Sequence, residues 1–295
     1  MHRRDPDLRR TWLFGPGADP AVHDAMVASG ADVLIVDLED FTPAPRRAEA
    51  RHRLAAVAAR CRERGALFAV RVNQLDHADG HADLAAAMAA RPDVIACPMA
   101  ERPPQMRELD AAIATWEGTL GIEPGSTELL PVCETALGVV EVRALAAASA
   151  RIRCALLGTE DLAADLCAER GADAVELDHA RRRFVLECRA ARIEPIDAPY
   201  TFADVDGALR EALYARRLGY RSKSLVRPEH AAPLNDTFTP DEAALRRAQA
   251  VVQAFEAARA RGEERALVDG QWVEVPTYRN AWRLVQRAQR LRGST

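Results

Sequence analysis

Short apolar runs recur along the chain, and each is bounded by polar residues, glycine or proline. Eight of them have the length and the β-branched content of buried strands, at residues 11–15, 33–37, 67–72, 94–98, 129–133, 154–158, 194–197 and 222–226. The stretches between them carry apolar positions three and four apart, as in 48–64 and 204–218, which is the spacing of one helix face. Residues 21–29 end at Gly30, a good helix terminator. The pattern therefore predicts a strand–helix unit repeated eight times.

Strands that alternate with helices form a parallel sheet, which is either closed into a barrel or open and doubly wound. The count of eight favours the closed α/β fold, a (β/α)₈ barrel of the TIM type. An open nucleotide-binding sheet would place a G-x-G-x-x-G loop after its first strand. The segment Gly15-Pro16-Gly17 is too short for that loop and contains a proline.

The chain continues beyond the eighth strand. A long helix is predicted over about 240–261, followed by a hairpin over 265–276 that turns at Asp269-Gly270, a strong turn pair. A final helix is predicted over about 277–291. We expect a barrel domain over 1–260 and a C-terminal tail over 261–295, a helix–hairpin–helix appendage that packs on a neighbouring subunit.

Composition narrows the class of protein. The chain has 295 residues, 48% of them hydrophobic, and a formal net charge of -4, which argues against nucleic acid as a partner. No run of 18 apolar residues is present, so no membrane span is expected, and the first residues lack the apolar stretch of a signal peptide. The six cysteines show no C-x-x-C spacing and are predicted to be reduced thiols of a cytoplasmic protein.

Acidic and basic residues follow directly after several predicted strands. Asp37 ends the second strand, Arg71 lies near the end of the third, Glu134 follows the fifth and Asp161 follows the sixth. In a TIM-type barrel the carboxyl ends of the strands form the active site. Carboxylates are the ligands that Mg²⁺ prefers, so Glu134 and Asp161 are predicted metal ligands for Mg²⁺ or Mn²⁺. A cation beside Arg71 suits chemistry through an enolate, which a lyase, an isomerase or a hydrolase could each use.

Six motifs occur in order along the chain, at residues 10–17 (RTWLFGPG), 36–40 (VDLED), 70–73 (VRVN), 133–138 (CETALG), 158–166 (GTEDLAADL) and 195–197 (PID). Together they resemble the citrate lyase β-subunit and malyl-CoA lyase family, a branch of the HpcH/HpaI aldolase superfamily with a phosphoenolpyruvate mutase-like barrel. The resemblance covers about residues 10–285. It implies a magnesium-dependent lyase that cleaves, or forms, a 3-hydroxyacyl-CoA such as citryl-, malyl- or citramalyl-CoA. The small-molecule partners would be an oxo acid and a CoA thioester.

The resemblance also implies roles for individual residues. Glu134 and Asp161 match the two metal ligands, and Arg71 matches the arginine that binds the oxo-acid oxygens and the developing enolate. Asp37 is expected to orient Arg71 or to hold metal-bound waters, and is counted with the catalytic residues. The expected substrate-binding residues, besides Arg71, are Arg10, Pro16, Gly17, Glu39 and Asp40.

In the family, the tail carries an aspartate that reaches a neighbouring subunit's site as general acid/base. Members are usually trimers or hexamers, so a homo-oligomer is expected. Here the corresponding residue is Glu274, one methylene longer, and it is the third predicted catalytic residue. Two other positions depart from the family pattern: Met99 stands where a lysine is usual, and Arg227 stands where a histidine is usual.

Two alternatives to a CoA-thioester lyase remain open at the level of sequence. One is an aldolase that acts on a free 2-oxo acid, or a thioesterase or synthase variant. The other is a metal-binding barrel that is catalytically impaired and serves as an accessory protein.

Overall fold

The eight predicted strands close into one parallel barrel. A computed structural model describes residues 4–293. In it each strand pairs with the next, and the eighth returns to pair with the first. The strands are β1 (Thr11–Pro16), β2 (Val33–Asp37), β3 (Leu67–Arg71), β4 (Val94–Cys97), β5 (Glu128–Cys133), β6 (Cys154–Leu157), β7 (Glu194–Tyr200) and β8 (Lys223–Leu225). The predicted (β/α)₈ architecture is confirmed, and seven of the predicted strands match to within one residue at each end. The exception is β7, which runs three residues beyond the predicted end at residue 197.

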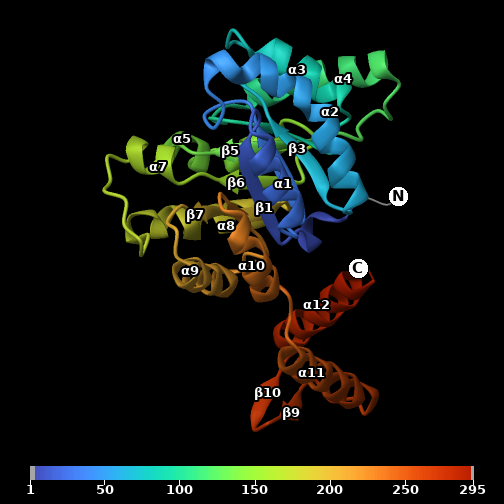
Figure 1. Ribbon diagram of the computed structural model, residues 1–295. Coiled ribbons are helices and arrows are strands. Elements are labelled where there is room, and N and C mark those ends of the chain that lie inside the picture. Colours follow the sequence, from blue (N-terminus) through green and yellow to red (C-terminus); the bar gives the residue numbers. More distant parts are fainter. Residues whose placement is uncertain (1–3, 294–295) are drawn as a thin grey trace. The chain divides into compact units, whose positions relative to one another are not determined.

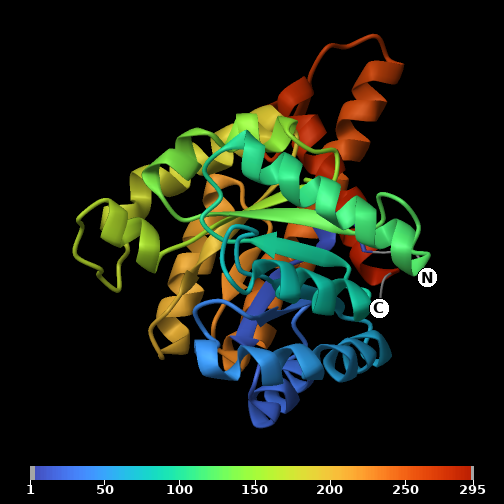
Figure 2. The ribbon, with the colours of Figure 1, turned by 90° about the horizontal axis from the view of Figure 1, so that it is seen from above.

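Helices connect the strands and surround the barrel (Figure 1). Seen from above, they form an outer layer around the strands (Figure 2). They are α1 (Pro20–Ala28), α2 (Arg47–Glu63), α3 (Gly80–Ala89), α4 (Pro103–Leu120), α5 (Ala136–Val140), α6 (Val142–Ala147), α7 (Glu160–Asp165), α8 (Asp178–Ala191), α9 (Val205–Leu218) and α10 (Ala231–Phe238). Short 3₁₀ turns lie at Pro6–Leu8, Ala44–Arg46, Val175–Leu177 and Pro228–His230.

The interior of the barrel is a packed apolar core. Alternate residues of the strands point inward, among them Phe14, Ile35, Ala69, Val132 and Leu156, and all are buried. This alternation follows from the period of two in a β-strand. It decides which residues at the carboxyl ends of the strands face the barrel axis, because every second residue after a core residue also points inward.

The chain divides into two compact units, residues 1–235 and residues 236–295. The expected boundary at 260/261 is thus displaced, because α11 (Glu242–Ala260) packs against the tail elements and belongs to the second unit. That unit also contains the hairpin β9 (Ala266–Val268) and β10 (Gln271–Val273) and the helix α12 (Val275–Arg292). Phe255 of α11 stacks on Tyr278 of α12 with ring centroids 4.7 Å apart. The predicted helix, hairpin and final helix are confirmed, and Asp269 and Gly270 have the positive φ angles of a tight hairpin turn.

All six cysteines are free, and five of them are buried, with Cys167 exposed. Across residues 4–293, no helix has the length and apolar character needed to cross a membrane.

Candidate active site

The carboxyl end of the barrel is where the inward-facing positions become polar. Asp37, Arg71, Glu134 and Gly158 each follow, by two residues, a core residue of the same strand. Asp37 and Arg71 are also direct partners in the β2–β3 register. The predicted cluster of strand-end residues therefore forms because the alternation of the core strands continues for one more step.

Arg71 lies at the centre of this cluster and is 5% exposed. Its guanidinium donates to Asp37, and Nη1 lies 2.8 Å from Glu39 Oε2 and 3.9 Å from Glu134 Oε2. Burial disfavours the charged guanidinium, but the three carboxylates outweigh it and raise the pKa of Arg71. The charge of Arg71 is thus fixed, and it is shared among more acids than it can neutralise.

Two adjacent aromatic rings pack against the same guanidinium. The Arg71 Cζ lies 5.3 Å from the ring centroid of Phe14 and 5.7 Å from that of Phe41, and the two rings meet edge to face. Cation–π contacts of this kind hold an arginine in one orientation without using its hydrogen-bond donors. The buried Nε of Arg71 has no hydrogen-bond partner, so the forked guanidinium group retains one unused donor.

Glu134 and Asp161 lie beside this fork. The backbone N–H of Met99 donates to Glu134 Oε1 over 2.8 Å, and Asp161 lies in the first turn of α7. Gly158 leaves room for Glu134, because a Cβ at Gly158 would lie 2.5 Å from the Cβ of Glu134. Burial, which Arg71 and Met99 only partly offset, raises the pKa of Glu134 to about 7, with Asp161 contributing repulsion. Burial and the charge of Asp40 raise the pKa of Asp161.

Burial is the main cause of the raised pKa values of Glu134 and Asp161, and the charge of Arg71 offsets it only in part. The same effect acts on Glu39, where burial raises the pKa to about 7. A divalent cation would supply the missing charge, and the oxygen donors of Glu134 and Asp161 suit Mg²⁺. Within residues 4–293, no three His, Cys, Asp or Glu side chains are grouped so that they could hold a metal. Mg²⁺ commonly binds to one or two carboxylates and completes its shell with water and substrate oxygens, and the donor set of Glu134 and Asp161 is of this kind.

A cavity of about 200 Å³ opens between these residues. Arg71, Glu134, Asp161 and Asp40 line it, together with residues that were not among the predicted site residues: Phe14, Phe41, Val132, Leu156, Gly158, Thr159, Glu160, Pro199, Thr201 and Val226. Glu160 accepts hydrogen bonds from Thr201 and from Arg170. Thr201 was missed because β7 continues to Tyr200, which brings residue 201 to the rim of the barrel.

Arg10 is not part of this cavity, which corrects its assignment as a substrate-binding residue. It precedes β1 and is therefore at the amino end of the barrel, where its guanidinium and backbone N–H donate to Asp32. The motif that begins at Arg10 ends at the opposite mouth, because the strand between them crosses the whole barrel.

Pro16 and Gly17 do reach the carboxyl end but do not line the cavity. The Gly17 N–H donates to the carbonyl of Asp37 and to the Thr42 hydroxyl, which ties the first rim loop to the second. A Cβ on Gly17 would lie 2.8 Å from that of Ala50. Their position supports a shaping role for the loop rather than contact with a ligand.

Lys223, the single lysine, is buried away from this cavity. Its Nζ lies 2.7 Å from Asp197 Oδ2 and 2.9 Å from Glu211 Oε2, and Arg181 also pairs with Asp197. Asp197 lies within β7 and not at its end, next to the inward-facing Ile196, so its side chain points out of the barrel. Lys223 therefore pairs with carboxylates between strands and helices.

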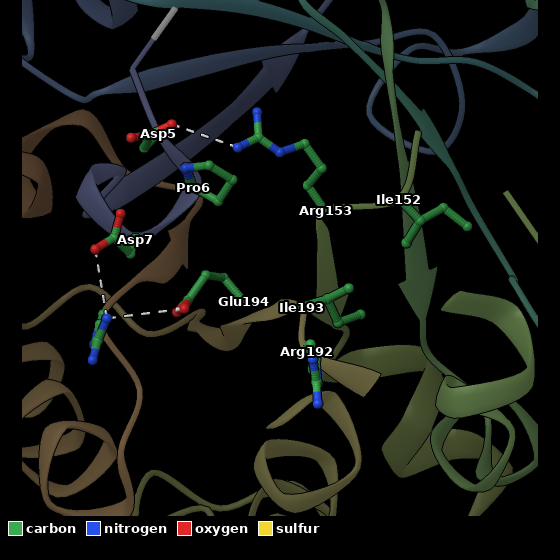
Figure 3. A pocket seen from close by; sticks show the side chains of 9 residues that line it. Asp5, Pro6, Asp7, Ile152, Arg153, Arg192, Ile193 and Glu194 are labelled. Carbon is green, nitrogen blue, oxygen red and sulfur yellow. Dashed lines mark hydrogen bonds and ion pairs between the residues drawn. The ribbon is translucent and has the colours of Figure 1, made fainter. Parts of the chain in front are cut away.

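A second, larger cavity of about 420 Å³ lies at the amino end of the barrel. It is lined by residues that precede β1, β6, β7 and β8. Asp5 faces Arg153 at 3.5 Å, and Asp7 and Glu194 both face the guanidinium of Arg221 (Figure 3). Glu194 also lies 2.5 Å from Arg189. Each carboxylate of this cavity thus has an arginine partner. The cavity therefore has no surplus of negative charge that would attract a metal cation.

Comparison with known proteins places this geometry in a family. Residues 10–228 match the family model described as HpcH/HpaI aldolase/citrate lyase. The chain belongs to this family. Among curated relatives, the citrate lyase subunit beta of Leuconostoc mesenteroides subsp. cremoris is 33% identical over 95% of this chain and 93% of its own. The L-malyl-CoA/beta-methylmalyl-CoA lyase of Rhodobacter capsulatus is 29% identical over 96% of this chain and 95% of its own.

A solved structure of an HpcH/HpaI aldolase/citrate lyase relative shares the fold. The CitE protein of Mycobacterium tuberculosis, in complex with magnesium, acetoacetate and coenzyme A, is 27% identical. It superposes with a TM-score of 0.75 over 95% of this chain and 98% of that chain.

The three departures from the family motifs lie in different places. Met99 holds Glu134 through its backbone N–H and has a positive φ of 46°. Arg227 lies 3.5 Å from Glu229 and does not line the cavity. Glu274 belongs to the second unit, where it is exposed and precedes the first turn of α12 without a capping side-chain bond.

Proposed function

We propose that this chain is a Mg²⁺-dependent carbon–carbon lyase that cleaves, or forms, a 3-hydroxyacyl-CoA thioester, with a 2-oxo acid and an acyl-CoA as the other pair of reactants. The observation that carries the proposal is the acidic cluster of Glu134 and Asp161 beside the buried fork of Arg71 in one cavity. The names of the citrate lyase and malyl-CoA lyase relatives and the ligands of the CitE complex support the reaction type.

Glu134 and Asp161 are the residues that would hold Mg²⁺. When bound, the ion supplies positive charge to the oxygens of the oxo acid and lowers the energy of the charge that develops on them. The backbone N–H of Met99 holds the Glu134 carboxylate, and the absence of a side chain at Gly158 leaves room for it. The carboxylate therefore needs little rearrangement when the ion binds.

Arg71 supplies the second positive charge. In the cleavage direction the substrate hydroxyl loses its proton, its oxygen becomes the carbonyl of the oxo acid, and the electron pair of the broken carbon–carbon bond passes to the acyl thioester as an enolate. Arg71 stabilises this developing negative charge, because its orientation is fixed by Asp37, Phe14 and Phe41 before substrate binds. The enolate then takes up a proton at carbon to give the acyl-CoA.

The proton carrier in this proposal is Glu274, acting from the tail of a neighbouring subunit in a cytoplasmic trimer or hexamer. Mixing inactive Glu134→Gln subunits with inactive Glu274→Ala subunits tests this role. Hybrid oligomers should regain activity, because one subunit then contributes an intact barrel and the other an intact tail. Full activity in Glu274→Ala alone would remove Glu274 from the mechanism.

The test of the overall function is a cleavage assay on citryl-, malyl- and citramalyl-CoA with Mg²⁺, with EDTA as the metal-free control. The proposal predicts turnover of at least one thioester that EDTA abolishes and that Mg²⁺ or Mn²⁺ restores. A protein that binds Mg²⁺ and a 2-oxo acid but turns over no thioester would contradict it and favour an aldolase on free oxo acids or an accessory protein.

A further inference from the structure

The cavity at the carboxyl end combines a polar side with an extended apolar wall. Six of its lining residues are apolar: Phe14, Phe41, Val132, Leu156, Pro199 and Val226. Among the described residues that line it, Arg71 carries the single positive charge. A space of about 200 Å³ suits a small organic acid rather than an extended one.

Three of these apolar residues, Phe14, Val132 and Leu156, form the inner part of the cavity because of the strand alternation. Val132 and Leu156 are the inward positions directly before Glu134 and Gly158, and both are 1% exposed. Phe14 occupies the corresponding position on β1. A ligand group that points below the level of Glu134 therefore meets only hydrocarbon.

The other polar residues of the cavity are acids, apart from the neutral hydroxyl groups of Thr159 and Thr201. Asp40 and Asp161 carry negative charge, and Glu160 accepts from Thr201 and from Arg170. If the carboxylate and the oxo group of a 2-oxo acid face Arg71 and the metal-binding acids, the substituent on the oxo carbon is left with the apolar wall. A second carboxylate at that position would be buried against hydrocarbon without a cation, which is strongly unfavourable.

We propose that this cavity selects a 2-oxo monocarboxylate with a short apolar substituent, methyl or ethyl, over a 2-oxo dicarboxylate. This inference rests on the proposed function, since it assigns the oxo-acid half of that reaction. It predicts that the cleaved thioester carries an alkyl group on its hydroxyl-bearing carbon, where a citryl-type thioester carries a carboxymethyl group.

A matched pair of ligands tests the selection directly. 2-Oxobutyrate and oxaloacetate have similar size and differ in whether the chain ends in a methyl group or a carboxylate, and pyruvate is the smaller reference. Binding to the full chain with Mg²⁺ is followed by ligand-observed NMR, which also reveals any decarboxylation of oxaloacetate to pyruvate. We expect the monocarboxylates to bind on the order of a hundredfold more tightly than the dicarboxylate.

The outcomes separate this inference from the function on which it rests. Equal or tighter binding of oxaloacetate would overturn the selectivity and leave the lyase function in place. Selective binding of the monocarboxylates without turnover of any thioester would overturn the function and keep the selectivity. Failure of all three acids to bind in the presence of Mg²⁺ would overturn both.

A substitution at Val226 should reverse the selectivity for the oxo acid. Val226 lines the apolar wall and is half-buried, so a longer side chain at this position can reach the cavity. Val226→Lys adds a cation there, and Val226→Met adds similar length without charge. We expect Val226→Lys to shift the ratio of the two affinities toward oxaloacetate by about tenfold or more, and Val226→Met to leave the ratio unchanged. Equal ratios in the two folded variants would overturn the placement of the substituent against this wall.

Discussion

The two ends of the barrel both carry buried or half-buried carboxylates, but their charges are balanced in opposite ways. At the amino end, the Glu128 carboxylate accepts hydrogen bonds from both Nη groups of Arg9, at 2.6 and 2.8 Å, and the Asp32 carboxylate accepts one from the guanidinium of Arg10. Burial opposes ionisation of Asp32, but the hydrogen bonds and charge of Arg10 outweigh it and lower the pKa of Asp32. At the carboxyl end, burial raises the pKa of Glu134 to about 7, and the charge of Arg71, which also pairs with Asp37 and Glu39, offsets this only in part.

This difference in charge balance says more about which end of the barrel binds a ligand than the size of the two cavities does. The larger cavity lies at the amino end, where each carboxylate has an arginine partner. The smaller one lies where charge is left unbalanced, and unbalanced buried charge is typical of a site that awaits a ligand. Substitutions at the carboxyl end should therefore change activity, and substitutions at the amino end should change stability.

The largest effect is expected at the acids that we propose as metal ligands, Glu134 and Asp161. Asp161→Asn removes a negative charge from the cluster, and we expect turnover to fall by about a thousandfold while the fold is kept. Thioester cleavage at saturating Mg²⁺ measures this change. Asp165→Asn is the control, since Asp165 lies on the same helix and accepts from the Ala136 N–H, a bond that asparagine preserves. Equal activities in the two variants would remove Asp161 from the site.

The opposite result is expected at the amino end. Glu128→Gln leaves the fully buried guanidinium of Arg9 without its charged partner, which should lower the free energy of unfolding by about 3 kcal/mol. Chemical denaturation measures the loss, and the turnover number of the remaining folded protein should not change. Glu49→Gln is the matched control, because the pairs of Glu49 with Arg46 and Arg53 are exposed, and no measurable change in stability is expected there. A large loss of turnover in folded Glu128→Gln would contradict the claim that the amino end of the barrel contributes to stability and not to activity.

A smaller effect is expected where the backbone approaches Glu134, one of the two proposed metal ligands. Gly158→Ala places a Cβ 2.5 Å from that of Glu134, so Glu134 must shift. We expect a loss of about 2 kcal/mol in the free energy of unfolding, and weaker Mg²⁺ binding. Gly118→Ala on α4 is the control, since a Cβ there meets no atom within 4 Å. Unchanged Mg²⁺ affinity in Gly158→Ala would show that the position of Glu134 is not critical.

The smallest effect concerns pH. Protons compete with the cation for Glu134, whose pKa is raised from 4.5 to about 7, so Mg²⁺ affinity should fall up to about tenfold per pH unit below about 7. Because the folded pKa lies above the unfolded value, the metal-free fold binds the proton more tightly than the unfolded chain. The free energy of unfolding without metal should therefore decrease as pH rises from about 4.5 to about 7. Glu134→Gln should reduce this slope, and an unchanged slope would contradict the assignment.

The sequence predicts the barrel and most of the strand-end cluster for the same reason. Alternating apolar positions define the strands, and the polar residues that continue them, Asp37, Arg71 and Glu134, must face the barrel axis. The sequence does not show where a strand ends when the pattern is irregular. The register of β7 against β8 shifts between Asp197 and Tyr200, which hid the approach of Thr201 to the cavity.

Three other features also needed the structure. Arg10 is close in sequence to Pro16 and Gly17, but an extended strand of six residues spans roughly 20 Å and places them at opposite ends of the barrel. Phe14 and Phe41 look like ordinary core and loop residues in sequence. Only the fold shows that both rings pack against the guanidinium of Arg71. The sequence-based boundary at 260/261 came too late in the chain. The apolar spacing of α11 would be the same whether the helix packed on the barrel or on α12, so the sequence could not assign it to the second unit.

The most direct test of the difference between the two ends is calorimetric titration of Mg²⁺ into the wild-type chain, Glu134→Gln and Glu194→Gln. Both substitutions replace a cavity-lining carboxylate by an amide, one at each end of the barrel. We predict that the wild type and Glu194→Gln bind one Mg²⁺ with the same affinity and that Glu134→Gln shows no binding. Undiminished binding by Glu134→Gln, or loss of binding in Glu194→Gln, would contradict the assignment of the metal site to the carboxyl end.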